Sequence, residues 1–276
     1  MIKKIVLADA FGEIADNFFS DPQGASTAIE SWLGVYCFSM QIFFDFSGYT
    51  DMAIACGRFF GFHFPENFRR PYLATNITNF WRRWHISLST WLRDYLYIPL
   101  GGNRHGTYKM YRNLMLTMLL GGLWHGASWN FIWWGGLHGI ALVAHKVFLD
   151  LRPRLLSFKV ISPVVKVLSA FLTFIFVMNC WVFFRADSFR DATTILANMW
   201  NLPSNFSEFN GDRIEWVLLV SVVILLIAVL QEKFDLLEKI HKGSAALNVI
   251  YLIICFFILE FFTINRIDIP FIYFQF

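Results

Sequence analysis

The chain has 276 residues, of which 57% are hydrophobic, 19% aromatic and 16% charged, and its formal net charge is +3. Ordinary soluble domains contain about 45–50% apolar and about 25% charged residues. This excess of apolar residues excludes a soluble globular enzyme and indicates an integral membrane protein surrounded by a lipid bilayer. We expect no nucleic-acid partner.

Six apolar stretches of about the length that crosses a bilayer follow one another along the chain. A transmembrane helix needs about 20 apolar residues, and only helices or closed barrels satisfy the backbone in lipid. None of the stretches alternates with a period of two residues, which disfavours a barrel. We therefore predict an all-α, polytopic transmembrane helical bundle that forms a single domain over residues 1–276. The stretches are residues 31–62, 114–126, 128–148, 163–184, 216–230 and 245–262.

Basic residues are concentrated between the first and second stretches. Residues 58–112 contain nine Lys and Arg residues against two acidic ones, and the positive-inside rule places such a segment in the cytoplasm. The loop 185–213 and the tail after Arg266 are then expected on the outer side. This topology requires residues 31–62 to cross once, although their length and polar residues leave two short crossings open.

Residues 80–95 combine tryptophans, arginines and a histidine. With a helical period, His85 lies in the middle of an apolar stripe and the arginines lie opposite, so we predict one amphipathic helix in the membrane interface. Pro99 and the pair Gly101-Gly102 are expected to end it. The helix is either purely structural or directs His85 into the bundle. The stripe consists of Trp81, His85, Leu88, Leu92 and Leu96.

A second histidine, His125, lies between the apolar residues 114–120 and 131–134 and is expected at membrane depth. Ionisable side chains at that depth are expensive and are therefore functional candidates. Glycines four residues apart on both sides of it let helices approach closely, or leave room for a ligand beside the ring. The alternative is a core histidine bonded to a neighbouring helix. These glycines are Gly122, Gly126, Gly135 and Gly139.

Metal binding is the other common use of histidines. His138 and His145 are seven residues apart, which is about 10 Å along a helix axis, so they cannot both bind one ion directly. The hairpin formed by residues 114–148 contains no carboxylate. We therefore predict no metal site and no bound cofactor.

A histidine in an apolar cavity has its charged form disfavoured, so the neutral base dominates near pH 7. Such a base can take the proton of a hydroxyl as the hydroxyl oxygen attacks an activated acyl carbon. The spacing of the sequence shows that a histidine base is available in an apolar place. It does not show a hydroxyl positioned beside that base.

Several sequence motifs together resemble those of the membrane-bound O-acyltransferase (MBOAT) family. The resemblance covers nearly the whole chain and points to the bacterial branch that contains the alginate O-acetylation subunit and the membrane protein of teichoic-acid D-alanylation. The motifs are residues 79–104, ending YLYIPLGGNR, with 123–130 (LWHGASWN), 45–51 (DFSGYTD), 64–68 (FPENF) and 270–276.

This resemblance implies an MBOAT fold and transfer of an acetyl or other acyl group from a cytoplasmic donor across the bacterial inner membrane. The acceptor would be an exported polysaccharide, as in alginate biosynthesis, and the donor acetyl-CoA or an acyl carrier protein. A separate extracytoplasmic acetyltransferase would complete delivery. His125 would be the general base and His85 the second family position. The expected supporting shell is Trp124, Ser128, Asn130, Arg93 and Asp94.

The aromatic C-terminus, residues 271–276, is expected on the outer side. The Tyr273 hydroxyl is then a candidate relay that receives the acyl group and passes it onward. The alternative is an aromatic anchor at the membrane interface.

Family members carry several more helices before the position of Met1, so the resemblance implies that the chain is a C-terminal part of a longer protein. Three other functions stay open. They are a non-catalytic membrane scaffold or transport component, D-alanyl transfer to teichoic acid, and acyl transfer to a lipid or a protein.

Overall fold

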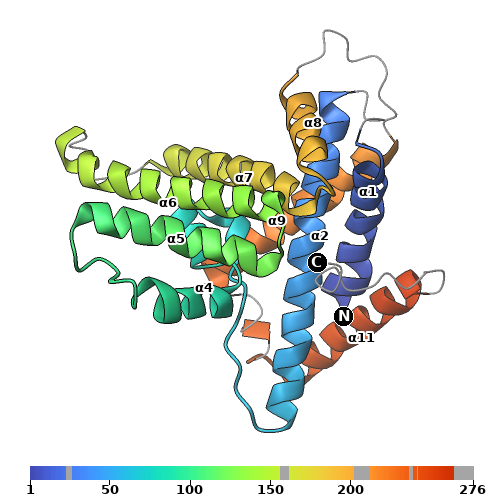
Figure 1. The fold of residues 1–276 in the computed structure, drawn as a ribbon. Helices are drawn as coiled ribbons and strands as arrows, with labels where there is room; N and C mark the ends of the chain where they lie inside the picture. The colour runs from blue at the N-terminus through green and yellow to red at the C-terminus, as the bar shows by residue number, and fades with distance from the viewer. Residues whose placement is uncertain (23–26, 156–161, 202–211, 236–238, 241, 264–276) are drawn as a thin grey trace. The chain divides into compact units, whose positions relative to one another are not determined.

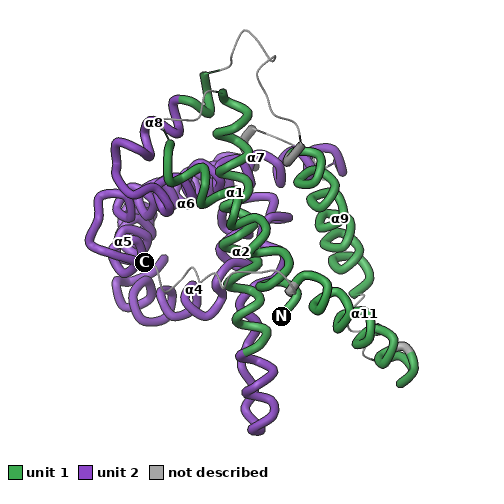
Figure 2. The backbone as a smooth tube through the Cα atoms, turned by 90° about the vertical axis from the view of Figure 1, so that its right-hand side faces the viewer, with its two compact units in different colours: residues 1–52, 198–275 green, residues 53–197, 276 purple. Residues whose placement is uncertain are grey.

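The computed structural model describes residues 1–22, 27–155, 162–201, 212–235, 239–240 and 242–263, and within these ranges the chain is helical and contains no strand (Figure 1). This confirms the predicted all-α class. The chain divides into two compact units. Unit 1 comprises residues 1–52 and 198–275, and unit 2 comprises residues 53–197 and 276 (Figure 2).

Unit 1 contains a short π-helix and helices that come from both ends of the chain. The π-helix η1 (Lys3–Ala8) continues into α1 (Asp9–Ser20), and α9 (Asp212–Phe234) and α11 (Ala245–Thr263) follow near the C-terminal end. In this unit Tyr36 donates a hydrogen bond to Ser221 at 2.5 Å, which connects two helices that are far apart in sequence.

The stretch 31–62 forms most of one continuous helix, α2 (Ala28–Phe59), which begins in unit 1 and ends in unit 2. Its start carries a capping box, because the Thr27 N–H donates to Glu30 and the Glu30 N–H donates to Thr27. Its buried Asp45 accepts from Lys4 at 2.9 Å, which compensates the carboxylate charge. One unbroken helix contradicts two short crossings, and α2 is not among the described helices that are apolar enough to cross a membrane.

Unit 2 holds the remaining elements. After the 3-10 turn η2 (Pro71–Leu73) come the short helices α3 (Ile77–Trp81) and α4 (Ile86–Leu92) and the π-helix η3 (Arg93–Tyr97). A long hairpin follows, made of α5 (Thr107–His125) and α6 (Trp129–Leu155), and α7 (Pro163–Arg185) packs on α6. Helix α8 (Phe189–Trp200) leads back into unit 1.

The glycines beside His125 serve helix packing. A Cβ built on Gly122 would overlap the Phe131 carbonyl oxygen, and one on Gly135 would overlap the Met118 carbonyl oxygen. The expected close approach of the two helices is therefore confirmed. At Gly126 the Phe131 ring lies 2.7 Å from the position that a Cβ would take, so this glycine lets an aromatic ring approach closely.

Three helices are long and apolar enough to cross a membrane: Trp129–Leu151 in α6, Pro163–Arg185, which is α7, and Ile214–Phe234 in α9. The shorter Asn248–Phe262 of α11 is also apolar. Each of the six apolar stretches read from the sequence is thus helical, and three of them meet the full length and composition of a membrane span.

The prediction of one helix over residues 80–95 is wrong. The chain leaves α3 after Trp81, and His85 takes the left-handed conformation with φ 40° before α4 begins. Asn67 accepts from the Ile86 N–H through its carbonyl and from the Ser87 N–H through its side chain, at 3.0 and 2.9 Å. These bonds satisfy the first free N–H groups of α4 from a distant loop, which stabilises the break.

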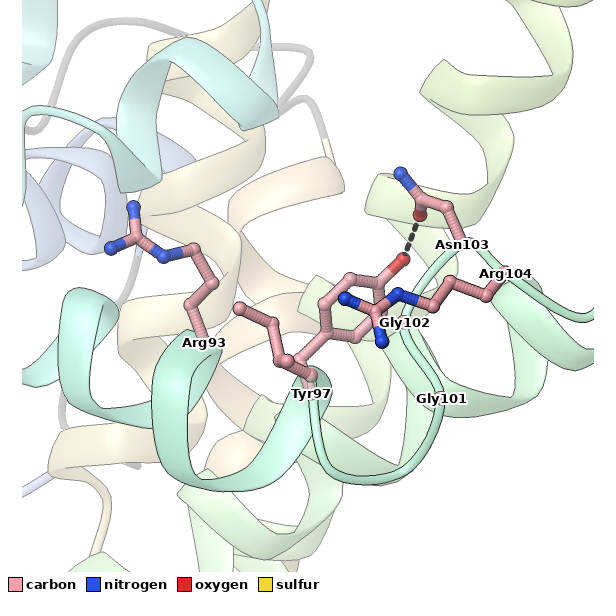
Figure 3. A pocket seen from close by; sticks show the side chains of 7 residues that line it. Arg93, Tyr97, Gly101, Gly102, Asn103 and Arg104 are labelled. Atoms are coloured by element: carbon pink, nitrogen blue, oxygen red, sulfur yellow. Dashed lines mark hydrogen bonds between the residues drawn. The ribbon is translucent and has the colours of Figure 1, made fainter.

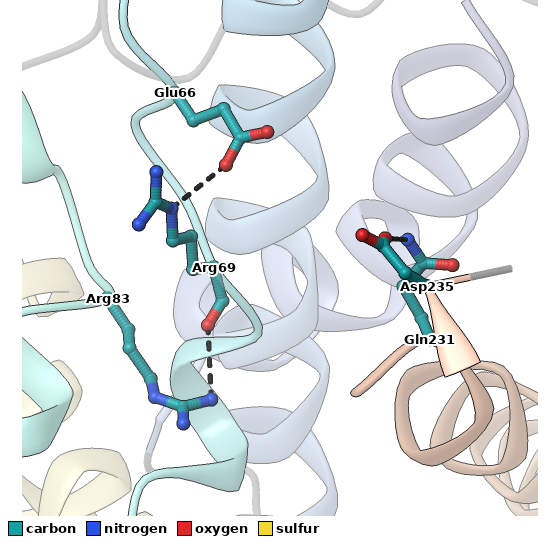
Figure 4. Close-up of polar contacts among 5 residues, drawn as sticks. All are labelled: Glu66, Arg69, Arg83, Gln231 and Asp235. Atoms are coloured by element: carbon teal, nitrogen blue, oxygen red, sulfur yellow. Dashed lines mark hydrogen bonds and ion pairs between the residues drawn. The ribbon is translucent and has the colours of Figure 1, made fainter. Parts of the chain in front are cut away.

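A second link holds the same loop against the break. The Arg69 N–H donates to the Arg83 carbonyl at 2.9 Å, and the Arg83 guanidinium donates back to the Arg69 carbonyl at 3.4 Å. Arg69 also pairs with Glu66 at 2.9 Å (Figure 4). Trp81 and Trp84, on either side of the end of α3, are both buried.

Candidate active site

His125 is the last residue of α5 and lies in a cage of aromatic rings drawn from three helices of unit 2. Its ring is half-buried. Four rings lie with their centroids 4.9 to 6.1 Å from that of His125, and three of them meet it edge to face. These rings belong to Trp124 of α5, Phe131 and Trp134 of α6, and Phe184 of α7.

His85 belongs to the same site, although 40 residues separate it from His125 in the sequence. Burial, and after it the nearby His125, lowers the pKa of His85 to about 3. The charge of His125 reaches His85 and contributes to this shift, so the two imidazoles lie within electrostatic range of each other. Protonating either ring therefore makes protonation of the other more costly.

A third histidine, His138, lies deeper in α6 and is fully buried. The Trp81 Nε1–H donates to His138 Nδ1 at 3.3 Å, so the His138 proton is on Nε2. Neither that Nε2 nor Trp134 Nε1 has a hydrogen-bond partner among the described residues. Both N–H groups are available to an acceptor oxygen of a ligand. The aromatic rings around them offer no such acceptor.

Trp134 connects the two histidines. Its ring centroid lies 5.2 Å from that of His125 and 4.9 Å from that of His138. It also stacks beside Trp181 of α7 at 6.1 Å. The His125 ring therefore has aromatic neighbours, and these orient it while lowering the local polarity.

The predicted shell residues divide into three groups. Trp124 contacts the His125 ring directly, at 4.9 Å. The Ser128 hydroxyl accepts from the Asn130 N–H at 3.2 Å, and the buried Asn130 amide donates to the Ala186 carbonyl at 2.7 Å. These two residues fix the turn after His125 and its attachment to the end of α7.

Arg93 and Asp94 form the third group. They pair with each other at 2.7 Å and are exposed, and Arg93 lines a separate pocket beyond the end of α4. Tyr273 lies outside the described residues. Among the described residues no three His, Cys, Asp or Glu side chains are grouped to hold a metal ion.

Sequence reasoning did not identify the rings of Trp134 and Phe184 as neighbours of His125, or that of His138 as a neighbour of Trp134. Trp134 and His138 are four residues apart on one helix and Trp181 and Phe184 three apart on another, and these spacings do predict two aromatic faces. They do not predict that the two faces meet at the end of α5.

The sequence model of the MBOAT, membrane-bound O-acyltransferase family matches residues 1–184. The chain belongs to this family, and it is a multi-pass membrane protein.

Its relatives include the probable alginate O-acetylase AlgI of Azotobacter vinelandii, which is 48% identical over 253 residues, covering 88% of this chain and 48% of the relative. The peptidoglycan O-acetyltransferase of Helicobacter pylori is 47% identical, covering 73% of this chain and 37% of the relative. A teichoic acid D-alanyltransferase of Streptococcus thermophilus is 36% identical, covering 42% of this chain and 30% of the relative. The chain thus spans about half the length, or less, of these curated relatives.

Proposed function

We propose that the protein is an O-acetyltransferase of the bacterial inner membrane, which moves an acetyl group from a cytoplasmic donor across the bilayer for O-acetylation of an exported polysaccharide. The observation that carries this proposal is the placement of His125 in an aromatic cage, with His85 within electrostatic range, in a chain 48% identical to a probable alginate O-acetylase.

His125 is the general base of the proposed reaction. In its water-poor cage the uncharged imidazole is favoured, and it takes the proton of an acceptor hydroxyl as the oxygen attacks the thioester carbon of the donor. A new C–O bond forms, the C–S bond breaks, and the thiolate leaves and receives the proton from the imidazolium. His85 is proposed to position the reacting groups and to limit charge in the cage.

Acetyl-CoA or an acyl carrier protein is the proposed donor, since either presents an acetyl thioester. On the outer side, the Tyr273 hydroxyl is the proposed relay, and a separate extracytoplasmic acetyltransferase is the proposed partner that completes delivery. Replacing Tyr273 with Phe keeps an aromatic anchor and removes the nucleophile. Polymer acetylation that is unchanged in Tyr273→Phe would remove the relay from the proposal.

The decisive variant is His125→Ala in the protein expressed from its natural gene. We expect ester-linked acetate on the exported polymer, measured by NMR after isolation, to fall at least 100-fold, which is the scale of general-base catalysis. His63→Ala, a change at an exposed histidine of unit 2, is the control and should leave acetylation at the wild-type level. Normal acetylation in His125→Ala would instead indicate a scaffold or transport component.

D-alanyl transfer to teichoic acid is the second candidate, favoured by the 36% identical relative. The same samples decide between the two. Mass spectrometry of the groups released by mild base would show acetate in the first case and D-alanine in the second.

A further inference from the structure

Two histidines of α6 have no role in the proposed reaction. His138 is fully buried, and His145 follows it by seven residues on the same helix. Seven residues make about two helical turns, so both side chains lie on one face of α6. Burying an imidazole costs free energy unless its nitrogens are hydrogen-bonded. The hydrogen bonds that these rings make therefore indicate what the rings do.

Both rings bind the same short helix, α3. The Trp81 Nε1–H donates to His138 Nδ1 at 3.3 Å, and Thr78 Oγ1 lies 2.8 Å from His145 Nδ1, within hydrogen-bond distance. Thr78 and Trp81 are three residues apart and share one face of α3. The two histidines of α6 thus hold α3 at two points.

Helix α3 depends on such contacts for its place. It has five residues, and isolated helices shorter than about 12–15 residues are marginal in water. The His138 ring stacks on Phe80 with centroids 6.1 Å apart and an interplanar angle of 10°, and it meets the Trp81 ring edge to face at 5.1 Å. His138 therefore contacts the last two residues of α3, in addition to accepting the Trp81 hydrogen bond.

The end of α3 is also the start of the segment that carries His85. His85 follows Trp81 by four residues, and the hydrogen bonds from the preceding loop stabilise the turn between them. Because this turn is short and hydrogen-bonded, a displacement of Trp81 is passed on to His85.

The other end of this segment is anchored to a different helix. Beyond η3, the Asn113 amide of α5 donates to the Leu100 carbonyl at 3.0 Å. Figure 3 shows the neighbouring loop, in which Tyr97 donates to the Asn103 side chain. These bonds act well after His85 in the chain, so the hydrogen bond at the end of α3 is the nearer anchor.

On its other side, His138 faces the aromatic cage. Trp134 lies four residues before it on α6. The centroid of the Trp134 ring is 4.9 Å from that of His138 and 5.2 Å from that of His125. His138 thus lies between the helix end that leads to His85 and the ring that packs against His125.

His138 is not placed to act as a second base. Its unprotonated nitrogen, Nδ1, is the one that accepts from Trp81, and the other nitrogen carries the proton. The side chain is also fully buried, whereas a base must reach the proton that it removes. Any contribution of His138 to the reaction therefore acts through other residues.

We propose that His138 is a positioning residue, which fixes the end of α3 on α6 and thereby holds His85 within electrostatic range of His125. Imidazole suits this role because it is a flat ring that packs among aromatic rings and also carries an acceptor nitrogen. The effect of His138 on the position of His85 rests on these contacts alone. Its effect on the rate of acetyl transfer rests on the proposed function.

The test measures the protection of His85 from diethyl pyrocarbonate, which acylates unprotonated imidazole nitrogens that solvent reaches. The protein expressed from its natural gene is purified in lipid nanodiscs, and mass spectrometry follows each histidine, with the exposed His63 as internal reference. We expect the half-buried His85 to react more slowly than His63 in the wild type. In His138→Leu its relative rate should rise about 10-fold, because losing one buried hydrogen bond shifts an opening equilibrium by about that factor.

His138→Asn is the matched variant. Asparagine and leucine have similar shapes, and the asparagine side-chain oxygen accepts a hydrogen bond, so His85 should stay protected in His138→Asn. Trp81→Phe removes the donor instead and should expose His85 as His138→Leu does, with no further rise in the double variant. Thr117→Val, which removes a hydroxyl hydrogen bond within α5, should leave His85 protected.

Two checks separate positioning from general loosening. Melting temperatures identify a variant that does not fold, and Trp81→Phe carries the test if His138→Leu is lost. A rise in rate at His125 equal to that at His85 would indicate general loosening and overturn the proposal. Full protection of His85 in folded His138→Leu or Trp81→Phe, or equal exposure in His138→Asn and His138→Leu, would overturn it as well.

Turnover of acetyl-CoA gives a second readout. His138→Leu should lower kcat by about 100-fold, the cost of a small misplacement at a reacting centre, and leave KM nearly unchanged, whereas His138→Asn should restore most of the rate. The protection measurement involves no turnover, so the two proposals fail separately. Should His125→Ala retain full acetylation, the proposed function fails while the protection of His85 still decides the role of His138. Should His85 stay protected in His138→Leu while His125→Ala is inactive, only the role of His138 is lost.

Discussion

At the scale of single residues, His85 connects backbone conformation to the chemistry of the cage. Its left-handed φ of 40° ends the preceding helical segment, and the same change of direction brings its ring close to His125. Histidine, asparagine and aspartate adopt this conformation more readily than other side chains. The residue therefore serves both the fold and the site.

The lowered pKa of His85 makes the stability of the protein sensitive to acid. Its ordinary value is about 6.5 and its folded value about 3, so below pH 6.5 the unfolded chain takes up a proton that the folded chain does not. Stability is therefore full above pH 6.5 and is lost as the pH falls toward 3. At pH 5 the loss from His85 reaches at most about 2 kcal/mol.

His85→Asn tests this, since Asn tolerates the left-handed backbone and does not titrate. The apparent Tm in detergent should drop less between pH 7 and pH 5 in His85→Asn than in the wild type. The exposed His63→Asn should show the wild-type drop. Equal drops in all three proteins would contradict a His85 that stays neutral in the fold.

At the scale of helices, the sequence predicted the apolar elements well, because a run of apolar residues in lipid forms a helix whatever its neighbours are. It failed at residues 80–95. The break there depends on hydrogen bonds from Asn67 and Arg69, and a helical period read from local residues carries no information about a loop that returns from elsewhere. The aromatic cage was missed for the same reason, since it forms where three helices meet.

Two adjacent glycines of the α5–α6 hairpin, Gly135 and Gly136, have different surroundings. A Cβ at Gly135 would overlap the Met118 backbone, whereas one at Gly136 would lie 3.7 Å from a flexible Leu119 methyl group. Gly135→Ala should destabilise the protein by about 1–3 kcal/mol, as overpacking does. Gly136→Ala should be neutral or stabilising by up to about 1 kcal/mol, because alanine favours the helix.

Thermal unfolding followed by tryptophan fluorescence compares these adjacent variants under one condition. A lower Tm for Gly135→Ala alone is the expected result. Similar Tm values for both variants would mean that the two helices do not approach as closely as described.

At the scale of the whole molecule, charge distribution sets the side of the membrane on which each segment lies. The concentration of arginine and lysine in residues 58–112 predicts a cytoplasmic location for the end of α2 and for the loop before α5. Cys56, which is exposed near that end, is a natural reporter, whereas Cys37 and Cys180 are buried.

A charged, membrane-impermeant maleimide should therefore label Cys56 in inverted membrane vesicles and not in intact spheroplasts. Cys56→Ser should remove most of the labelling in inverted vesicles, because Cys37 and Cys180 are buried and Cys255 is partly buried on the apolar helix α11. Labelling of Cys56 in intact spheroplasts would reverse the topology and place residues 58–112 on the outer side.

The central claim is that His125 acts as a base on an acetyl thioester, and release of free thiol measures this most directly. The protein expressed from its natural gene is purified into lipid nanodiscs and supplied with acetyl-CoA and a soluble saccharide acceptor, and thiol is followed with a chromogenic disulfide. The account predicts acceptor-dependent thiol release by the wild type and at least a 100-fold lower rate in His125→Gln. An equal rate in His125→Gln, with matched folding, would contradict it.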